Sequence, residues 1–223
     1  LELCSPGEVS VTIPSFSAVF VTALYEYLLH SGDCVFTREV LPVARRIVDG
    51  FIRRIDPGCG LVPCYTEAGY WNFYEWQQGL DGGAIFRDYP LPVSYDAPLN
   101  AFVSMAIQSL SSIFAVLQES SSAKYYGEIA QRLNQCMDKA FWSEEEAAYS
   151  SFLTNGSLHH LCELTQSLFA CCGACPPDKL PVILKAISDK RLLPITLSCS
   201  IFKYEALLQL PDLYEQQVFE EIA

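Results

Sequence analysis

An aromatic segment that also carries amides and carboxylates lies between residues 70 and 83, and it holds two of the three tryptophans of the chain. Its candidate substrate-binding residues are Trp71, Asn72, Glu75, Trp76 and Asp81. Indole faces stack on the apolar C–H faces of sugar rings, and amides and carboxylates hydrogen-bond sugar hydroxyls. Glycines within the segment allow tight turns beside a ligand. The segment therefore predicts a carbohydrate-binding loop, and the alternative is that the two tryptophans only plug a helical core.

Other groups of reactive side chains carry weaker signals. Two sets offer zinc-ligand types without completing a four-ligand site: His159, His160 and Cys162, and then Cys171, Cys172 and Cys175. No GxSxG, GxGxxG or P-loop pattern occurs, so nucleophilic serine and nucleotide chemistry have no support. We therefore expect neither a metal nor a cofactor.

The composition is that of an acidic globular protein. Against 26 Asp and Glu there are 14 Lys and Arg, a formal net charge of −12, so we expect no nucleic acid and no anionic membrane as partner. No stretch reaches the roughly 18 uncharged apolar residues that a membrane helix needs, and we expect no N-terminal secretory signal. Ten cysteines lie mostly in apolar helical patterns, which favours reduced thiols and a cytoplasmic location, with secretion as the alternative.

Helical periodicity of apolar residues extends through most of the chain, and strand-like alternation appears nowhere at length. The first helix begins after Pro14 and closes at Gly32, and the third begins with Asp96 as its N-cap. The periodic segments predict eight helices, at residues 16–28, 40–55, 99–114, 126–140, 161–172, 180–187, 201–208 and 214–222.

The connections between the predicted helices alternate between short and long. The long ones cover residues 57–95, 143–159 and 189–197. In a stack of antiparallel hairpins every second connection lies at the same end, so all three long loops should gather on one rim. Because binding residues are concentrated on loops, we expect function at that rim.

The hexapeptide from Trp71 to Trp76 resembles the Trp-Asn-Phe-x-Asp-Trp pattern of the α-L-rhamnosidase group of six-hairpin glycosidases. Glu75 stands where that family usually has aspartate. Further similarity lies in residues 16–33, 96–101, 165–166 and 196–207, so that the resemblance covers nearly the whole chain. It implies an (α/α)6 toroid, inverting hydrolysis of a terminal sugar such as an α-L-rhamnoside, and a substrate-binding role for the tryptophan segment.

The resemblance also implies that the catalytic acid and base lie outside this chain, since the family has them before the part matched by Leu1 and after the part matched by Ala223. Eight helices are too few for a closed toroid of twelve. We therefore expect residues 1–223 to form a single all-α domain, an incomplete toroid truncated at both ends and inactive alone. Its uncovered flanks predict self-association or packing against the missing parts of the parent chain. A non-catalytic carbohydrate- or protein-binding module, or an isomerase or lyase, are the alternatives.

Overall fold

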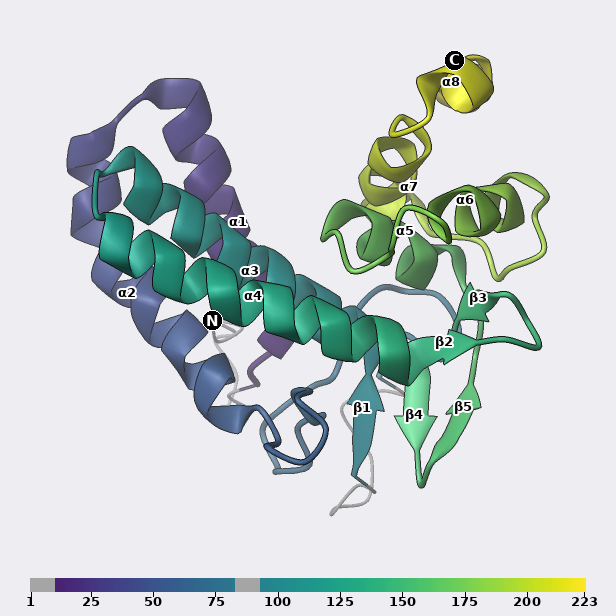
Figure 1. Ribbon diagram of the computed structural model, residues 1–223, viewed down its shortest axis with the longest axis horizontal. Coiled ribbons are helices and arrows are strands. Elements are labelled where there is room, and N and C mark those ends of the chain that lie inside the picture. The colour runs from purple at the N-terminus through teal and green to yellow at the C-terminus, as the bar shows by residue number, and fades with distance from the viewer. Residues whose placement is uncertain (1–10, 83–92) are drawn as a thin grey trace.

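The computed structural model describes residues 11–82 and 93–223, and in these ranges the chain is mostly helical (Figure 1). The eight helices are α1 Pro14–Ser31, α2 Cys34–Arg54, α3 Ala97–Val116, α4 Ser120–Phe141, α5 Glu163–Cys171, α6 Leu180–Ser188, α7 Ser200–Leu207 and α8 Pro211–Ile222. The predicted all-α class and all eight predicted helices are thereby confirmed.

The ends of the first two helices follow local chemistry. Pro14 is the first residue of α1, and Gly32 ends this helix with a left-handed φ of 68°. Asp33 then caps α2, because its side chain accepts hydrogen bonds from the backbone N–H groups of Val35 and Phe36.

Asp96 is the N-cap residue of α3, as predicted, with an extended backbone. Its carboxylate makes no capping bond to α3. It accepts hydrogen bonds from the Tyr74 hydroxyl at 2.7 Å and from Ser94 Oγ at 2.6 Å instead. These hydroxyls reach the carboxylate from the loop and the strand that precede α3.

The helices follow the arrangement of an α/α toroid. Helices α1, α3, α5 and α7 pack side by side in this order, and each is covered by the helix that follows it in the chain (Figure 1). The odd-numbered helices thus form an inner layer and the even-numbered helices an outer one. The four hairpins make an arc of the predicted ring.

One helix in the described part of the chain, α3, is long and apolar enough by length and composition to cross a membrane. The expectation that no stretch reaches this length was therefore wrong for α3. In the structure 67% of its apolar window is buried, and it packs against α1, α2, α4 and α5. Such burial is that of a central core helix.

In the part of the chain that the structure describes, five short strands were not predicted. A three-stranded antiparallel sheet has the order β1-β4-β5, and a two-stranded one pairs β2 with β3. The strands are β1 Ser94–Asp96, β2 Trp142–Ser143, β3 Ala148–Tyr149, β4 Phe152–Thr154 and β5 Ser157–His159. Strands of two or three residues are too short for alternation to reveal. Because β1 pairs with β4, they join the first two long connections.

The third long connection meets the other two on the same rim. Leu193 accepts a backbone hydrogen bond from Glu163 at 2.9 Å. The Gln77 side chain, in the first long connection, donates to the Pro194 carbonyl at 2.7 Å. The prediction that the long loops gather on one rim is confirmed.

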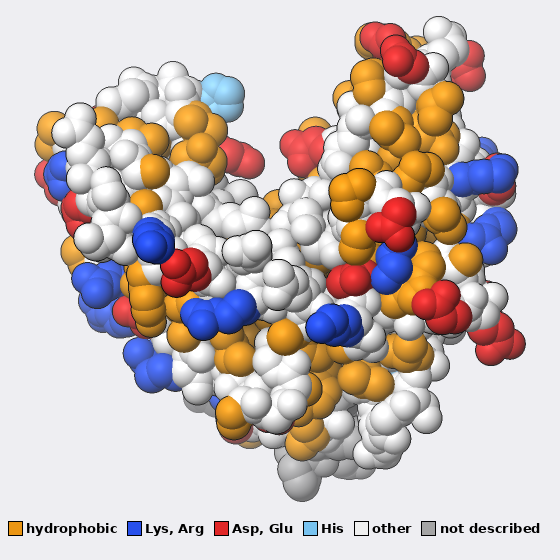
Figure 2. All heavy atoms as spheres, in the orientation of Figure 1, with side chains coloured by type: hydrophobic (Ala, Val, Ile, Leu, Met, Phe, Trp, Pro, Cys, Tyr) orange, Lys and Arg blue, Asp and Glu red, His pale blue; other side chains and the backbone are white. Residues whose placement is uncertain are grey.

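Apolar side chains are exposed on the two outermost hairpins. On α1 these include Phe16, Val19 and Tyr27, and on α8 they include Leu213 and Phe219. Hydrophobic side chains gather over the C-terminal hairpin at the upper right of Figure 2. Both flanks of the arc therefore present apolar surface, as the sequence predicted.

Candidate functional site

The loop over residues 70–82 is anchored by backbone hydrogen bonds at both ends. Trp71 N–H donates to the Thr12 carbonyl at 2.9 Å, just before α1 begins. Further along, Tyr74 N–H donates to the Leu80 carbonyl at 2.8 Å, so the loop closes on itself. A buried hydrogen bond of 2.6 Å from Ser15 Oγ to the Phe73 carbonyl ties the middle of the loop to α1.

Four aromatic rings form a packed group at this loop. Phe73 is buried, and its ring centroid lies 5.8 Å from Phe16 and 4.8 Å from Trp76, both in edge-to-face geometry. Trp71 lies 6.0 Å from Trp76. Trp76 is 69% exposed and forms the outer end of the group. Most of its surface is therefore exposed to solvent rather than packed in the helical core.

The Asn72 side chain forms two hydrogen bonds with the backbone of Tyr65. Its Nδ2 donates to the Tyr65 carbonyl at 2.7 Å, and its Oδ1 accepts the Tyr65 N–H at 3.0 Å. These two bonds use one of the two N–H donors and one of the two oxygen lone pairs of the amide. Asn72 therefore positions the loop.

Glu75 is buried, with only 1% of its surface exposed. Its Oε2 accepts hydrogen bonds from the Thr196 N–H at 2.8 Å and the Thr196 hydroxyl at 2.7 Å. Burial raises the pKa of this carboxyl, the Thr196 bonds lower it, and the charge of Glu163 raises it, with a net upward shift. The other oxygen, Oε1, is buried without a partner among the described residues. Glu75 thus ties the loop to the third long connection.

Asp81 contributes to the structure of the loop through its backbone carbonyl. Its carbonyl accepts a hydrogen bond of 2.8 Å from Trp71 Nε1, which fixes the orientation of that indole. Gly82 follows with a φ of +67°, and a Cβ there would lie 2.7 Å from both the Asn72 carbonyl oxygen and Trp71 Nε1. Only glycine fits this close approach without rearrangement.

Sequence reasoning missed His160 as a residue of this site. Its Nε2 lies 3.0 Å from the Gln78 carbonyl oxygen and its Nδ1 lies 2.9 Å from Ser151 Oγ. A carbonyl only accepts, so Nε2 carries the proton. His160 adopts a φ of +66°, and a Cβ at Gly79 would lie 2.9 Å from its Nε2. Because His160 and Gln78 are 82 positions apart in the sequence, no local sequence signal could have shown this contact.

A cavity of about 210 Å³ lies behind the loop, between it and the three-stranded sheet. Of the five predicted binding residues, only Asn72 lines it. The wall includes Tyr74 and Asp96 from the buried side and His159 from β5. The predicted residues therefore share one loop, but they do not converge on one pocket.

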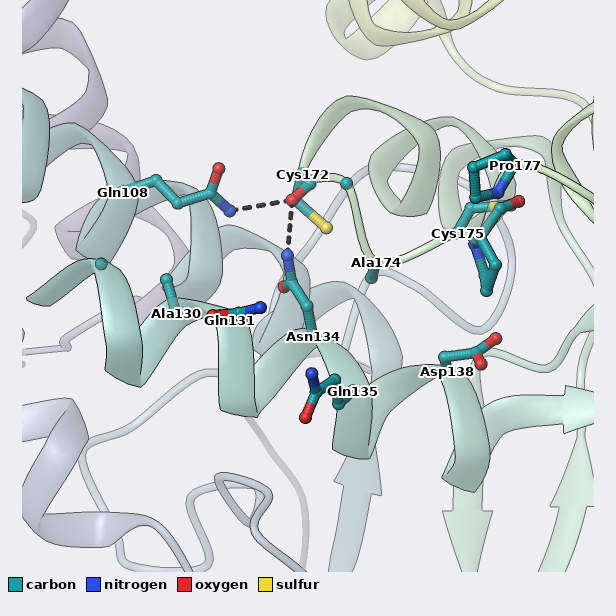
Figure 3. Close-up of a pocket in the computed structure, with 13 residues that line it drawn as sticks. Gln108, Ala130, Gln131, Asn134, Gln135, Asp138, Cys172, Ala174, Cys175 and Pro177 are labelled. Atoms are coloured by element: carbon teal, nitrogen blue, oxygen red, sulfur yellow. Dashed lines mark hydrogen bonds between the residues drawn. The ribbon is translucent and has the colours of Figure 1, made fainter.

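A larger groove, of about 510 Å³, lies between α4 and the turn that joins α5 to α6 (Figure 3). Gln108 Nε2 and Asn134 Nδ2 both donate to the Cys172 carbonyl, at 2.8 and 2.7 Å. These amides hold the turn against α3 and α4. No aromatic ring lines this groove, and it lies beside a short turn rather than the long loops.

The loop carries one buried carboxyl group and one exposed aromatic ring that could do chemistry. Glycoside hydrolysis needs two carboxyl groups that flank the scissile bond. Glu75 is buried, and its Oε2 is bonded to Thr196. The exposed Trp76 indole offers a flat apolar surface on the same loop.

The arrangement of the helices is that of part of an α/α toroid. No family model and no curated protein matches the sequence. Among solved structures, the chain is similar to the GH78 family rhamnosidase of Bacillus sp. GL1, with a TM-score of 0.74 and 22% identity over 96% of this chain. It is also similar to a rhamnosidase from Klebsiella oxytoca with rhamnose bound, with a TM-score of 0.74 and 21% identity over 97% of this chain.

An α-L-rhamnosidase from Dictyoglumus thermophilum is similar at a TM-score of 0.61 and 19% identity over 88% of this chain. These likenesses confirm the predicted toroid fold and the resemblance to α-L-rhamnosidases in structure. The chain spans 22%, 39% and 20% of the lengths of the Bacillus, Klebsiella and Dictyoglumus proteins, respectively.

Proposed function

We propose that this chain is the sugar-binding part of the catalytic toroid of a glycoside hydrolase that acts on a terminal, α-L-rhamnoside-like sugar. The observation that carries the proposal is the exposed Trp76 indole, held at the end of a packed aromatic group on the rim where the three long loops meet. The toroid fold shared with rhamnosidases supports the same assignment.

The five predicted site residues divide into two roles in this proposal. Trp76 stacks on the sugar ring, and Trp71 forms the side of the platform. Asn72 and Glu75 position the loop through Tyr65 and Thr196, and Asp81 fixes the Trp71 indole through its carbonyl. The acid and base carboxylates of an inverting mechanism lie on segments outside this chain.

Calorimetric titration with methyl α-L-rhamnoside tests the proposal. Trp76→Ala should weaken binding by about tenfold, which corresponds to about 1.4 kcal/mol, because the stacking face is lost. Phe219→Ala is the matched control, since it removes an exposed aromatic ring from α8, outside the loop over residues 70–82. Equal affinity for the wild type and Trp76→Ala would overturn the proposed role of the loop.

The chain alone should not hydrolyse an aryl α-L-rhamnoside at an enzymatic rate. Loss of proton transfer at either carboxylate position typically costs on the order of 10²–10⁴-fold in rate. Clear turnover that Glu75→Gln abolishes would show that the chemistry resides in this loop after all.

A second proposal concerns the apolar flanks of the arc. We propose that the exposed faces of α1 and α8 are covered by further hairpins of the ring or by another copy of the chain. Sedimentation at micromolar concentration should show self-association of the isolated chain. If the wild-type chain is a monomer, and Phe219→Glu changes neither its solubility nor its mass in solution, the proposed cover of these faces is contradicted.

A further inference from the structure

Helix α2 gathers basic residues in an otherwise acidic protein. It carries five of the 14 Lys and Arg of the chain, namely Arg38, Arg45, Arg46, Arg53 and Arg54. Basic side chains are visible over α2 at the lower left of Figure 2. Three of the five have carboxylate partners, at 3.0 to 3.7 Å. Among the described residues Arg46 and Arg53 have none.

Two of these arginines line a cleft of about 290 Å³. The cleft lies between α2, the start of α1 and the segment that leads into the loop over residues 70–82, called the tryptophan loop below. Arg46 and Arg54 are eight residues apart on α2, so they lie on the same face two turns apart. Gly50 lies midway between them and also lines the cleft. A Cβ at Gly50 would touch nothing closer than 4.0 Å, so packing does not require glycine there. The missing side chain leaves the space between the two arginines open.

Arg54 is held in place before any ligand binds. Its guanidinium carbon lies 4.0 Å over the Tyr65 ring, and Nη1 pairs with Glu67 Oε1 at 3.0 Å. Tyr65 in turn stacks on Tyr70 with ring centroids 4.5 Å apart. The Nε–H of Arg54 is buried and has no acceptor among the described residues. A fixed guanidinium with an unmet donor loses little freedom when an anion binds beside it.

We propose that this cleft binds an oxyanion, a carboxylate or a phosphate, between Arg46 and Arg54. Arg46 supplies a charge without a counter-ion, and Arg54 supplies a guanidinium whose charge Glu67 only partly offsets. Guanidinium groups favour oxyanions because their planar N–H fork matches the oxygens of a carboxylate or a phosphate. Tyr70 lines the cleft and immediately precedes Trp71. The oxyanion can therefore belong to an acidic residue of the same glycan, an extension that rests on the proposed function.

Calorimetric titration of the chain with glucuronate, inorganic phosphate and glucose at constant ionic strength tests the site. Glucuronate and phosphate should bind and glucose should not, since glucuronate differs from it by a carboxylate. Tighter binding of glucuronate than of phosphate would assign the anion to a sugar acid, and the reverse order would assign it to a phosphate. Both orders support an oxyanion site, whereas binding of glucose as tight as glucuronate overturns it.

Arginine substitutions locate the binding. Arg46→Ala should weaken anion binding by about tenfold, and Arg46→Lys should restore part of it, because the charge returns without the planar fork. Arg45→Ala is the matched control, since it removes the same charge from the same helix, and Arg45 pairs with Asp49 and does not line the cleft. Absence of anion binding, or an equal loss in Arg45→Ala, would overturn the proposal. Methyl α-L-rhamnoside binding should be unchanged in Arg46→Ala, so this test fails or succeeds independently of the tryptophan loop.

Discussion

The α1–α2 turn on the short-turn rim and the loop over residues 70–82 on the long-loop rim are held by different kinds of contact. On the short-turn rim, Gly32 and Asp33 connect α1 to α2 with bonds to residues two to four positions away. On the long-loop rim, Glu75 is fixed by Thr196, 121 residues later, and Gln78 by His160. Changes in a short turn should therefore cost stability alone, and changes on the long-loop rim should also alter how the binding surface is arranged.

The largest expected effect concerns the base of the long-loop rim. Lys203 is almost fully buried on α7 and lies between Glu163 at 3.4 Å and Glu221 at 3.0 Å. Glu163 also accepts the backbone N–H of Ile195, in the third long connection. Lys203→Met should destabilise the fold by about 3–5 kcal/mol, because it leaves a buried carboxylate unpaired. Urea unfolding of the variant and of the wild type measures this difference in the free energy of unfolding.

Lys185→Met is the control for that substitution. Lys185 pairs with Asp189 at 2.7 Å, but the pair lies in solvent, so its loss should leave the urea midpoint almost unchanged. Similar midpoints for Lys203→Met and Lys185→Met would contradict the account of the rim.

Gly32 and Gly82 allow a direct comparison of the two rims, because their φ angles are nearly the same, 68° and 67°. Gly32→Ala meets no atom within 4 Å and should cost only the backbone strain, about 1–2 kcal/mol. Gly82→Ala would place Cβ 2.7 Å from a backbone oxygen, so the loop must also shift. Near-ultraviolet circular dichroism should change in Gly82→Ala and stay constant in Gly32→Ala. The same spectrum for both variants would mean that the loop tolerates the shift.

A smaller effect concerns pH. Burial raises the pKa of Glu75 above its ordinary value of 4.5, so the folded state binds this proton more tightly than the unfolded state. The contribution of Glu75 to stability is therefore greatest below pH 4.5 and is lost as pH rises through the raised pKa. Glu75→Gln stays neutral, so its stability relative to the wild type should rise with pH over this range. A stability difference that is constant with pH would contradict the raised pKa.

The contrast between the rims also explains what the sequence could predict. Helix periodicity, Pro14, Gly32 and Asp33 act over a few residues, so the helices and short turns were predictable. The loop residues were recognised by their types, but the engagement of Glu75 with Thr196 depends on contacts across the fold. The strands and His160 left no local signal for the same reason.

Asn72 shows a related limit. Its amide is the type of group that binds a sugar hydroxyl, and in the structure it also forms two hydrogen bonds with the Tyr65 backbone. Side-chain type alone cannot distinguish a residue that contacts a ligand from one that positions the loop around it. Trp76 differs because its exposure, 69%, comes only from the three-dimensional structure.

The indole N–H resonances give the most direct test of the proposed sugar site. The chain has three tryptophans, of which Trp71 and Trp76 lie on the loop and Trp142 lies in β2, against Tyr149 and Lys179. Titration with methyl α-L-rhamnoside, followed by nitrogen–proton correlation spectra, should shift the Trp76 signal most and the Trp71 signal less, and leave Trp142 in place. A saturating titration that moves only Trp142, or none of the three signals, would contradict the assignment of this loop to sugar binding.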